Sequence, residues 1–200
     1  MVSVIGTTSQ LSPNQLSKRQ QIIEAAQRVL AEQGLANCSV RAVAESSPLT
    51  KSAIHYYFSD MDELVDEAMS RHMEAFIARV RVAAGRETRP TERFWAAVKD
   101  YLDIFEENPG AALLWFDYWI DATRKGRTEP VDRMNSDVLA VFADLLTAVG
   151  VDEPAARAEA LFSGLLGLIV QQSVRRRPFE AVRRQIQLYC DVPDATPDHP

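Results

Sequence analysis

The sequence predicts an all-α protein of about nine helices, arranged as an N-terminal three-helix domain and a larger C-terminal helical domain. No stretch alternates apolar and polar residues over the length of a strand. Apolar residues recur instead at helical spacing, and short segments rich in Gly, Pro or polar residues separate these stretches. A chain of 200 residues is long enough to bury a core. It suits one large domain or two smaller ones.

The first helix is predicted over Lys18–Gln33. Its buried stripe consists of four residues that share one helical face, Ile22, Ala26, Val29 and Leu30. Gly34 follows directly and is a typical C-terminal cap. Residues 1–17 lack a basic start followed by an apolar block, which argues against a secretory signal. We therefore expect residues 1–17 to form a flexible arm.

Two short helices and one long helix are predicted next. Ser39 can cap a short helix that ends in the segment SSPL, and Thr50 can cap a second one that reaches Phe58. Both are too short to be stable alone, so they must pack on their neighbours. Asp60 and Glu63 resemble a capping box at the start of a long helix. Helix, sharp turn and helix make a helix-turn-helix, and residues 18–64 are expected to form its domain.

The remainder, residues 65–192, is predicted to be a second helical domain, and residues 193–200 a flexible tail. Its apolar stripes run over 94–105, 109–122, 134–146, 152–175 and 179–190. Asn108 and Pro109 mark a helix start, and Gly150 marks a helix end. The segment AALLWFDYWIDA is apolar on nearly all sides, which is typical of a helix inside a core.

Composition and motifs exclude several classes of protein. The longest apolar run, at 161–170, is too short for a membrane span, and the two cysteines, far apart, indicate a reducing cytoplasmic location. We found no metal-ligand spacing, P-loop, nucleophile elbow or di-iron motif. No enzyme, metal or cofactor is therefore predicted. Although the net charge is -6, residues 1–58 carry five basic and three acidic side chains, so the N-terminal part suits a polyanion best.

The second short helix carries the functional hypothesis. Its apolar residues would face the core and leave Lys51, Ser52, His55 and Tyr56 outside, with Tyr57 near its end. Small hydroxyl side chains can approach base edges in the major groove of DNA, and Lys, Tyr and His can reach phosphates. Ser39 and Arg41 could hold the backbone beside it. The alternative from the residues alone is a three-helix corner whose aromatic surface packs on another domain.

The run SVRAVAESSPLTKSAIHYYFSDMDELV, preceded by RQQIIEAAQRVLAEQGL, resembles the signature of the tetracycline-repressor (TetR) family. The resemblance implies a regulator, usually a repressor, that binds double-stranded operator DNA. It places nine residues on the DNA side: Ser39, Arg41, Thr50, Lys51, Ser52, Ala53, His55, Tyr56 and Tyr57. Two positions depart from the family pattern. Pro48 stands where Gly is usual, and Met61 stands where a Lys that could contact phosphate is usual.

The C-terminal half is similar to the BetI-like branch of the same family in layout, which implies a homodimer with a pocket for an unknown small-molecule effector. The predicted pocket residues are mostly aromatic: Met69, Met73, Trp95, Tyr101, Trp115, Phe116, Trp119, Asp121 and Phe142. Buried carboxylates are costly unless paired, so Asp121 is expected to meet solvent, Arg124 or a cationic ligand. An apolar or acyl ligand is the competing class, and simple core packing is the competing explanation for the aromatics.

The last two helices are predicted to form the dimer interface. Their apolar residues exceed what one core needs: Leu161, Phe162, Leu165, Leu166, Ile169, Val182, Ile186 and Tyr189. Burial of these residues within one chain is the competing interpretation. The prediction as a whole is a dimeric regulator released from a palindromic operator by a ligand. The alternative is a helical adaptor or small-molecule-binding protein that does not bind DNA.

Overall fold

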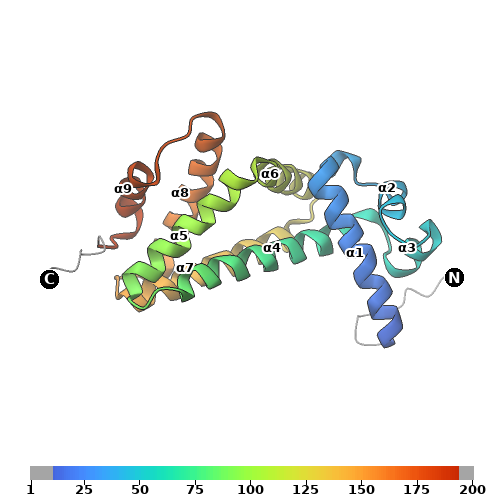
Figure 1. Ribbon diagram of the computed structural model, residues 1–200, viewed down its shortest axis with the longest axis horizontal. Coiled ribbons are helices and arrows are strands. Elements are labelled where there is room, and N and C mark those ends of the chain that lie inside the picture. Colours follow the sequence, from blue (N-terminus) through green and yellow to red (C-terminus); the bar gives the residue numbers. More distant parts are fainter. Residues whose placement is uncertain (1–10, 194–200) are drawn as a thin grey trace. The chain divides into compact units, whose positions relative to one another are not determined.

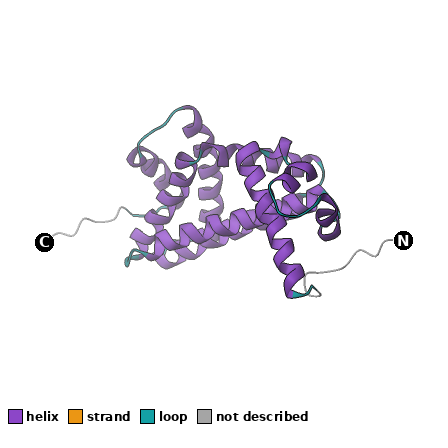
Figure 2. Cartoon of the chain, turned by 45° about the vertical axis from the view of Figure 1, so that its right-hand side comes forward, coloured by secondary structure: helices purple, strands orange, loops and turns teal. Residues whose placement is uncertain are grey.

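The computed structural model describes residues 11–193 of the chain, and every regular element in that range is helical (Figure 2). The described part contains nine α-helices and one short 3-10 turn, which confirms the predicted all-α fold. Two compact units divide the chain, at residues 1–73 and 74–200. Helix α4 (Met61–Gly85) contributes residues to both units. The domain division predicted at 64/65 lies in the first turns of the same helix and stays a prediction.

The first unit begins with α1 (Pro13–Gln33), which starts five residues before the predicted helix. Ser12 and Gln15 form a capping box, and Pro13 occupies the first helical position, where a missing N–H costs nothing. This Ser-Pro-x-Gln signal explains why residues 13–17 are helical rather than part of an arm. Residues 1–10 and 194–200, which complete the predicted arm and tail, lie outside the described residues. Gly34 ends α1 with φ of 77°, as predicted.

Helices α2 (Val40–Glu45) and α3 (Lys51–Tyr57) follow a 3-10 turn over Leu35–Asn37 (Figure 1). With only six and seven residues they depend on packing, and Val43 and Ile54 are their fully buried side chains. The Arg28 guanidinium of α1 donates to the Ser46 carbonyl oxygen at 2.6 Å, which attaches the turn after α2 to α1. The first unit is therefore held together mainly through α1.

Phe58 ends α3 in the core, next to the start of α4. The Arg19 guanidinium lies 4.6 Å from the centre of the Phe58 ring and pairs with Glu67 at 3.2 Å. Asp60 caps α4, because its Oδ1 accepts from the Glu63 N–H at 2.8 Å. The Glu63 carboxylate accepts from the Ser59 N–H, one residue earlier than a standard capping box would have it.

The second unit contains the rest of α4 and five further helices (Figure 1). They are α5 (Pro90–Glu107), α6 (Pro109–Arg124), α7 (Thr128–Val149), α8 (Pro154–Val174) and α9 (Phe179–Cys190). The predicted caps at Asn108–Pro109 and Gly150 are present, and Gly150 adopts the left-handed conformation. A cluster of aromatic rings from α4, α5 and α7 fills the core, with centroids 5.1 to 5.7 Å apart: Phe76, Tyr101, Phe105 and Phe142.

The contact between α8 and α9 is close because Gly164 has no side chain. A Cβ atom at Gly164 would lie 2.5 Å from the Tyr189 ring. Gly164 thus allows close packing of α8 and α9 within one chain. Six of the eight predicted interface side chains are buried in the core of the chain itself: Leu161, Phe162, Leu165, Ile169, Val182 and Ile186. These side chains keep at most 8% of their surface exposed, which favours the competing interpretation that one chain buries them. Their part in a dimer contact stays a prediction.

Candidate functional site

Helix α3 presents one polar face away from the core. Its inner face carries Ile54 and is followed by Phe58, both about 2% exposed. Four predicted DNA-facing residues of α3 are exposed: Lys51, Ser52, His55 and Tyr56. Ala53 and Tyr57 are half-buried at the edges of this face. We call the four exposed residues the outer face of α3.

The hydroxyls of Ser39 and Thr50 cap α2 and α3, as predicted. Ser39 Oγ accepts from the Ala42 N–H at 3.2 Å, and Thr50 Oγ1 accepts from the Ala53 N–H at 3.3 Å. A hydroxyl that accepts from the backbone keeps its own proton, because it carries one donor and two lone pairs. Both exposed caps can therefore still donate to an outside acceptor such as a phosphate oxygen.

Two other predicted DNA-facing residues, Arg41 and Tyr57, contact side chains of the same chain. The exposed Arg41 guanidinium pairs with Glu45 at 2.8 Å, and this hydrogen bond raises the pKa of Arg41. Such an exposed ion pair contributes little stability, so Arg41 can exchange Glu45 for another anion. The Tyr56 and Tyr57 rings meet edge to face at 4.9 Å, and burial raises the pKa of Tyr57, with a smaller contribution from Tyr56. The Tyr57 phenol is thus neutral near pH 7.

The turn between α2 and α3 contains the first departure from the family pattern. Ser47 Oγ accepts from the Leu49 N–H at 3.0 Å, so a side chain closes the turn around exposed Pro48. Hydroxyl–backbone turns of this type tolerate Pro, because the ring fixes φ without needing an N–H donor. The turn therefore forms without glycine.

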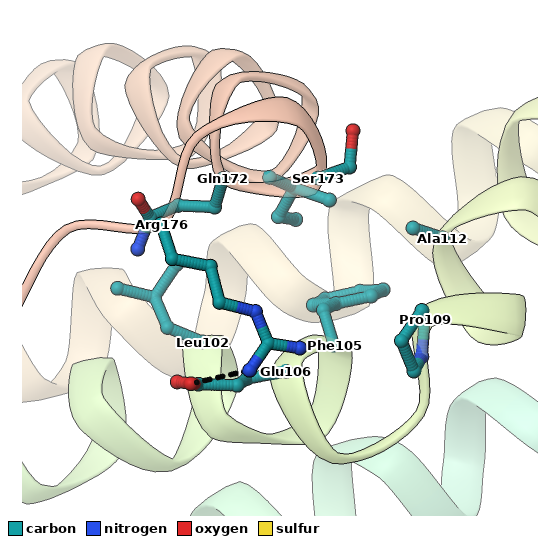
Figure 3. Close-up of a pocket in the computed structure, with 9 residues that line it drawn as sticks. Leu102, Phe105, Glu106, Pro109, Ala112, Gln172, Ser173 and Arg176 are labelled. Carbon is teal, nitrogen blue, oxygen red and sulfur yellow. Dashed lines mark hydrogen bonds and ion pairs between the residues drawn. The ribbon is translucent and has the colours of Figure 1, made fainter.

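An apolar cavity of about 110 Å³ lies in the second unit, where α5 ends, α6 begins and α8 ends (Figure 3). Its walls come from Leu102, Phe105, Pro109, Ala112 and Ile169, and its polar rim comes from Glu106, Gln172, Ser173 and Arg176. Arg176 and Glu106 form an ion pair of 3.1 Å across this rim. The space would take several water molecules or part of a small organic molecule.

None of the nine predicted pocket residues lines this cavity. Met69 and Met73 belong to the first unit. Four predicted aromatic residues of the second unit are buried: Trp95, Tyr101, Trp115 and Phe142. Phe116 and Trp119 are half-buried. Trp95 is fixed from two sides, because its indole N–H donates to the Pro193 carbonyl at 3.2 Å and the Arg183 guanidinium lies 4.5 Å from its ring.

Asp121 is satisfied within the chain, but not by the predicted Arg124. Its carboxylate pairs with Lys125 at 3.0 Å and with Arg127 at 3.2 Å. Because both cations come from the chain itself, the half-buried carboxylate needs no cationic ligand.

The sequence did not predict the cavity because its rim joins residues 70 positions apart, and no local spacing connects Glu106 with Arg176.

Within residues 11–193 no three His, Cys, Asp or Glu side chains come together in a way that could hold a metal ion. No helix in the same range is long and apolar enough to cross a membrane.

Comparison with known proteins identifies the first unit. The sequence model of the bacterial regulatory proteins of the tetR family matches residues 22–68, which include all of α2, the turn and α3. The HTH-type transcriptional regulator BetI of Stenotrophomonas maltophilia is 26% identical over 155 residues, covering 76% of this chain and 77% of BetI. Residues 22–68 are therefore an N-terminal domain of the TetR family.

Two further similarities differ in the share of the chain that they cover. The HTH-type transcriptional regulator PksA of Bacillus subtilis is 32% identical over 108 residues, so the match spans about half of each protein, 54% of this chain and 53% of PksA. The crystal structure of a transcriptional regulator from Rhodococcus sp. Rha1 shares the fold over 90% of this chain and 99% of that one, with a TM-score of 0.72 and 22% identity. The predicted family, and a regulator rather than an enzyme, are confirmed.

The second departure from the TetR pattern gives a direct test of the DNA face. Met61 is half-buried in the first turn of α4 between Asp60 and Asp62. We expect Met61→Lys to strengthen binding to a mixed-sequence duplex several-fold at low salt and to raise the salt slope by about one, because one more phosphate is neutralised. Fluorescence anisotropy at several salt concentrations measures both. Ala75→Lys, an exposed change of equal charge later in α4, is the control. If the salt slope were equal for the wild type, Met61→Lys and Ala75→Lys, position 61 would not lie at the DNA interface.

Proposed function

We propose that this TetR-family regulator is a homodimeric repressor, which binds a roughly palindromic operator in the cytoplasm and is released by a small molecule. The observation that carries the DNA-binding part is the exposed outer face of α3, a helix whose opposite side buries Ile54 in the core. An exposed row of ammonium, hydroxyl, imidazole and phenol groups matches the acceptors of a major groove and its phosphates.

Selection of bound duplexes from a random pool tests this proposal. A repressor dimer should enrich a sequence with two related half-sites about one helical turn apart. Retention on the selected duplex should fall steeply with salt, because phosphate contacts release counterions. A helical adaptor that does not bind DNA would enrich no sequence and show no salt-dependent retention.

The dimer contact is proposed for the outward side of α8 and α9. Val174 and Leu188 are 88% and 81% exposed, and Val170 is exposed one turn before Val174. A shallow groove at the end of α8 joins Val170 and Val174 to Arg175 and Arg177. Large apolar side chains on adjacent helices are costly in water, and a second copy of the same surface would cover them.

The effector is proposed to bind in the cavity between α5, α6 and α8. Its apolar part would lie against Leu102, Phe105 and Ile169, and its polar part would exchange with the Glu106–Arg176 pair at the rim. This pair is exposed, so its rearrangement costs little. A thermal-shift screen of small amphipathic compounds would find such a ligand, because binding to the native state raises the unfolding midpoint.

A path from this cavity to α4 is available through two adjacent carboxylates. Glu106 pairs with Arg176 at the cavity rim, and the next residue, Glu107, pairs with Arg79 of α4 at 2.8 Å. Arg79 also reaches Asp100 of α5 at 3.2 Å, so one guanidinium holds two positions of α5. A ligand that moves the end of α5 would therefore act on α4, which also contributes residues to the DNA-binding unit.

Arg79→Met tests this coupling. We expect ligand from the screen to raise the unfolding midpoint as in the wild type, but to weaken DNA binding about two- to tenfold less, because the α4–α5 link is lost. Anisotropy titrations with and without ligand measure the difference. Arg81→Met is the matched control, since Arg81 is exposed on α4 and makes no ion pair among the described residues. Undiminished release in Arg79→Met would contradict the path.

A further inference from the structure

The exposed phenol of Tyr56 has a fixed partner inside the first unit. Tyr56 is 54% exposed on the outer face of α3. Its oxygen accepts a hydrogen bond of 3.1 Å from the Nε2 amide of Gln15, which belongs to the first turn of α1. The start of α1, part of the predicted arm, therefore contacts the predicted DNA-binding surface directly.

The direction of this hydrogen bond is set by the capping box of α1. The Ser12 backbone N–H donates to Gln15 Oε1 at 2.9 Å. A backbone N–H can only donate, so the amide oxygen of Gln15 must face Ser12 and its NH₂ group must face Tyr56. The Gln15 N–H in turn donates to Ser12 Oγ at 3.4 Å, which completes the box. Gln15 cannot turn its amide without breaking a helix cap.

The Gln15 NH₂ group faces the Tyr56 phenol and so determines which further hydrogen bond the phenol can make. Since the Tyr56 oxygen accepts from Gln15, its single proton must be donated elsewhere. The phenol is exposed, so that direction leads out of the protein. Phosphate oxygens are acceptors only, and they are the most abundant partners on a DNA surface. A phenol with its proton directed outward is suited to a phosphate and unsuited to a donor.

We propose that Gln15 is a positioning residue for DNA binding, which holds the Tyr56 hydroxyl as a hydrogen-bond donor to a backbone phosphate. The proposal rests on the proposed DNA-binding function. It extends that function to the first turn of α1, and it assigns Tyr56 to phosphate anchoring rather than to reading bases. A neutral donor releases no counterion of its own, so its loss lowers affinity without changing the salt slope.

A double-mutant cycle on a fluorescein-labelled duplex of mixed sequence tests the role, because phosphate contacts do not depend on base sequence. We expect Tyr56→Phe to weaken binding about tenfold or more, the cost of one hydrogen bond to a charged acceptor. Gln15→Met should weaken binding about threefold in the wild type, and not at all when combined with Tyr56→Phe. The salt slope should stay that of the wild type in all three.

Gln15→Glu reverses the hydrogen bond while keeping the capping box, since glutamate also serves at this position of the box. Its carboxylate would accept the phenol proton and withdraw it from the phosphate. We expect Gln15→Glu to bind DNA more weakly than Gln15→Met does. When each is combined with Tyr56→Phe, the difference in affinity between these two variants should be smaller. The remainder is the general effect of the added negative charge.

Gln20→Met is the matched control on the same helix, because Gln20 bonds Glu24 of α1. It should bind like the wild type, and circular dichroism melts would show that each variant is folded. Absence of salt-dependent binding by the wild type would refute the proposed function itself. Binding by the wild type, with an equal cost of Gln15→Met whether or not Tyr56 is present, would refute the positioning role alone.

Discussion

Val174→Glu is expected to convert the protein to a monomer and to weaken operator binding about a hundredfold or more. Val174 is 88% exposed at the end of α8, so a carboxylate there is solvated in the monomer and the fold of the chain is unaffected. In the proposed dimer the same carboxylate would be buried opposite its own copy, and an unpaired buried charge is strongly unfavourable. A monomer loses the second DNA contact and with it the gain from bivalent binding.

Analytical ultracentrifugation measures the oligomeric state, and anisotropy on the selected operator measures affinity. Leu113→Glu is the control, because Leu113 is 68% exposed on α6, outside the proposed contact. It should remain dimeric with wild-type affinity. A dimeric Val174→Glu variant with unchanged affinity would place the interface on another surface of the chain.

Leu165→Ala is expected to destabilise the folded chain by about 3 kcal/mol and to leave the oligomeric state unchanged. The Leu165 side chain has no exposed surface in the chain, so the substitution leaves a cavity in the core of the second unit. Leucine-to-alanine changes at such positions cost about 3–5 kcal/mol. Urea unfolding at a fixed protein concentration measures the loss, since dimer stability depends on concentration.

Leu166→Ala is a matched variant at the adjacent, half-buried position, and it should cost clearly less. Together, the two variants show whether the Leu165 side chain belongs to the core of one chain or to the dimer contact. If Leu165→Ala dissociated the dimer without a loss of unfolding free energy, the result would support the predicted interface that includes Leu165.

Local signals in the sequence predicted the first unit well. Ser39 and Thr50 act as caps, and Gly34 ends α1, because capping requires only a few neighbouring residues. Ser12, Pro13 and Gln15 carried a signal of the same kind, and with it the true start of α1 could have been predicted. The exposure of the outer face of α3 followed from helical period alone.

The second unit could be predicted only in outline, because its helices are apolar on more than one side. In the segment LFSGLLGLIV, helical spacing identifies buried residues but does not say whether the same chain or a second copy buries them. Leu165 and Val170 lie in this one segment, yet the first is buried and the second is exposed. The packing of the neighbouring helices, chiefly α7 and α9, on α8 distinguishes them.

Ion pairs were predicted less well than caps. Asp121 pairs with Lys125, four residues later, and with Arg127, beyond the end of α6, in place of the predicted Arg124. The cavity rim depends on Arg176, which meets Glu106 from a distant part of the chain. Such contacts depend on tertiary geometry, which neither period nor capping specifies.

The shortness of α2 and α3 limits how their sequence can be used outside this protein. A synthetic peptide covering residues 39–58 would lack Arg28, which binds the turn, and the rest of α1, which packs on α2. Helices of six and seven residues do not form on their own in water, so that peptide would be a disordered ligand. Engineering a new DNA specificity therefore means grafting the outer-face side chains onto a complete host domain, and not transplanting the segment.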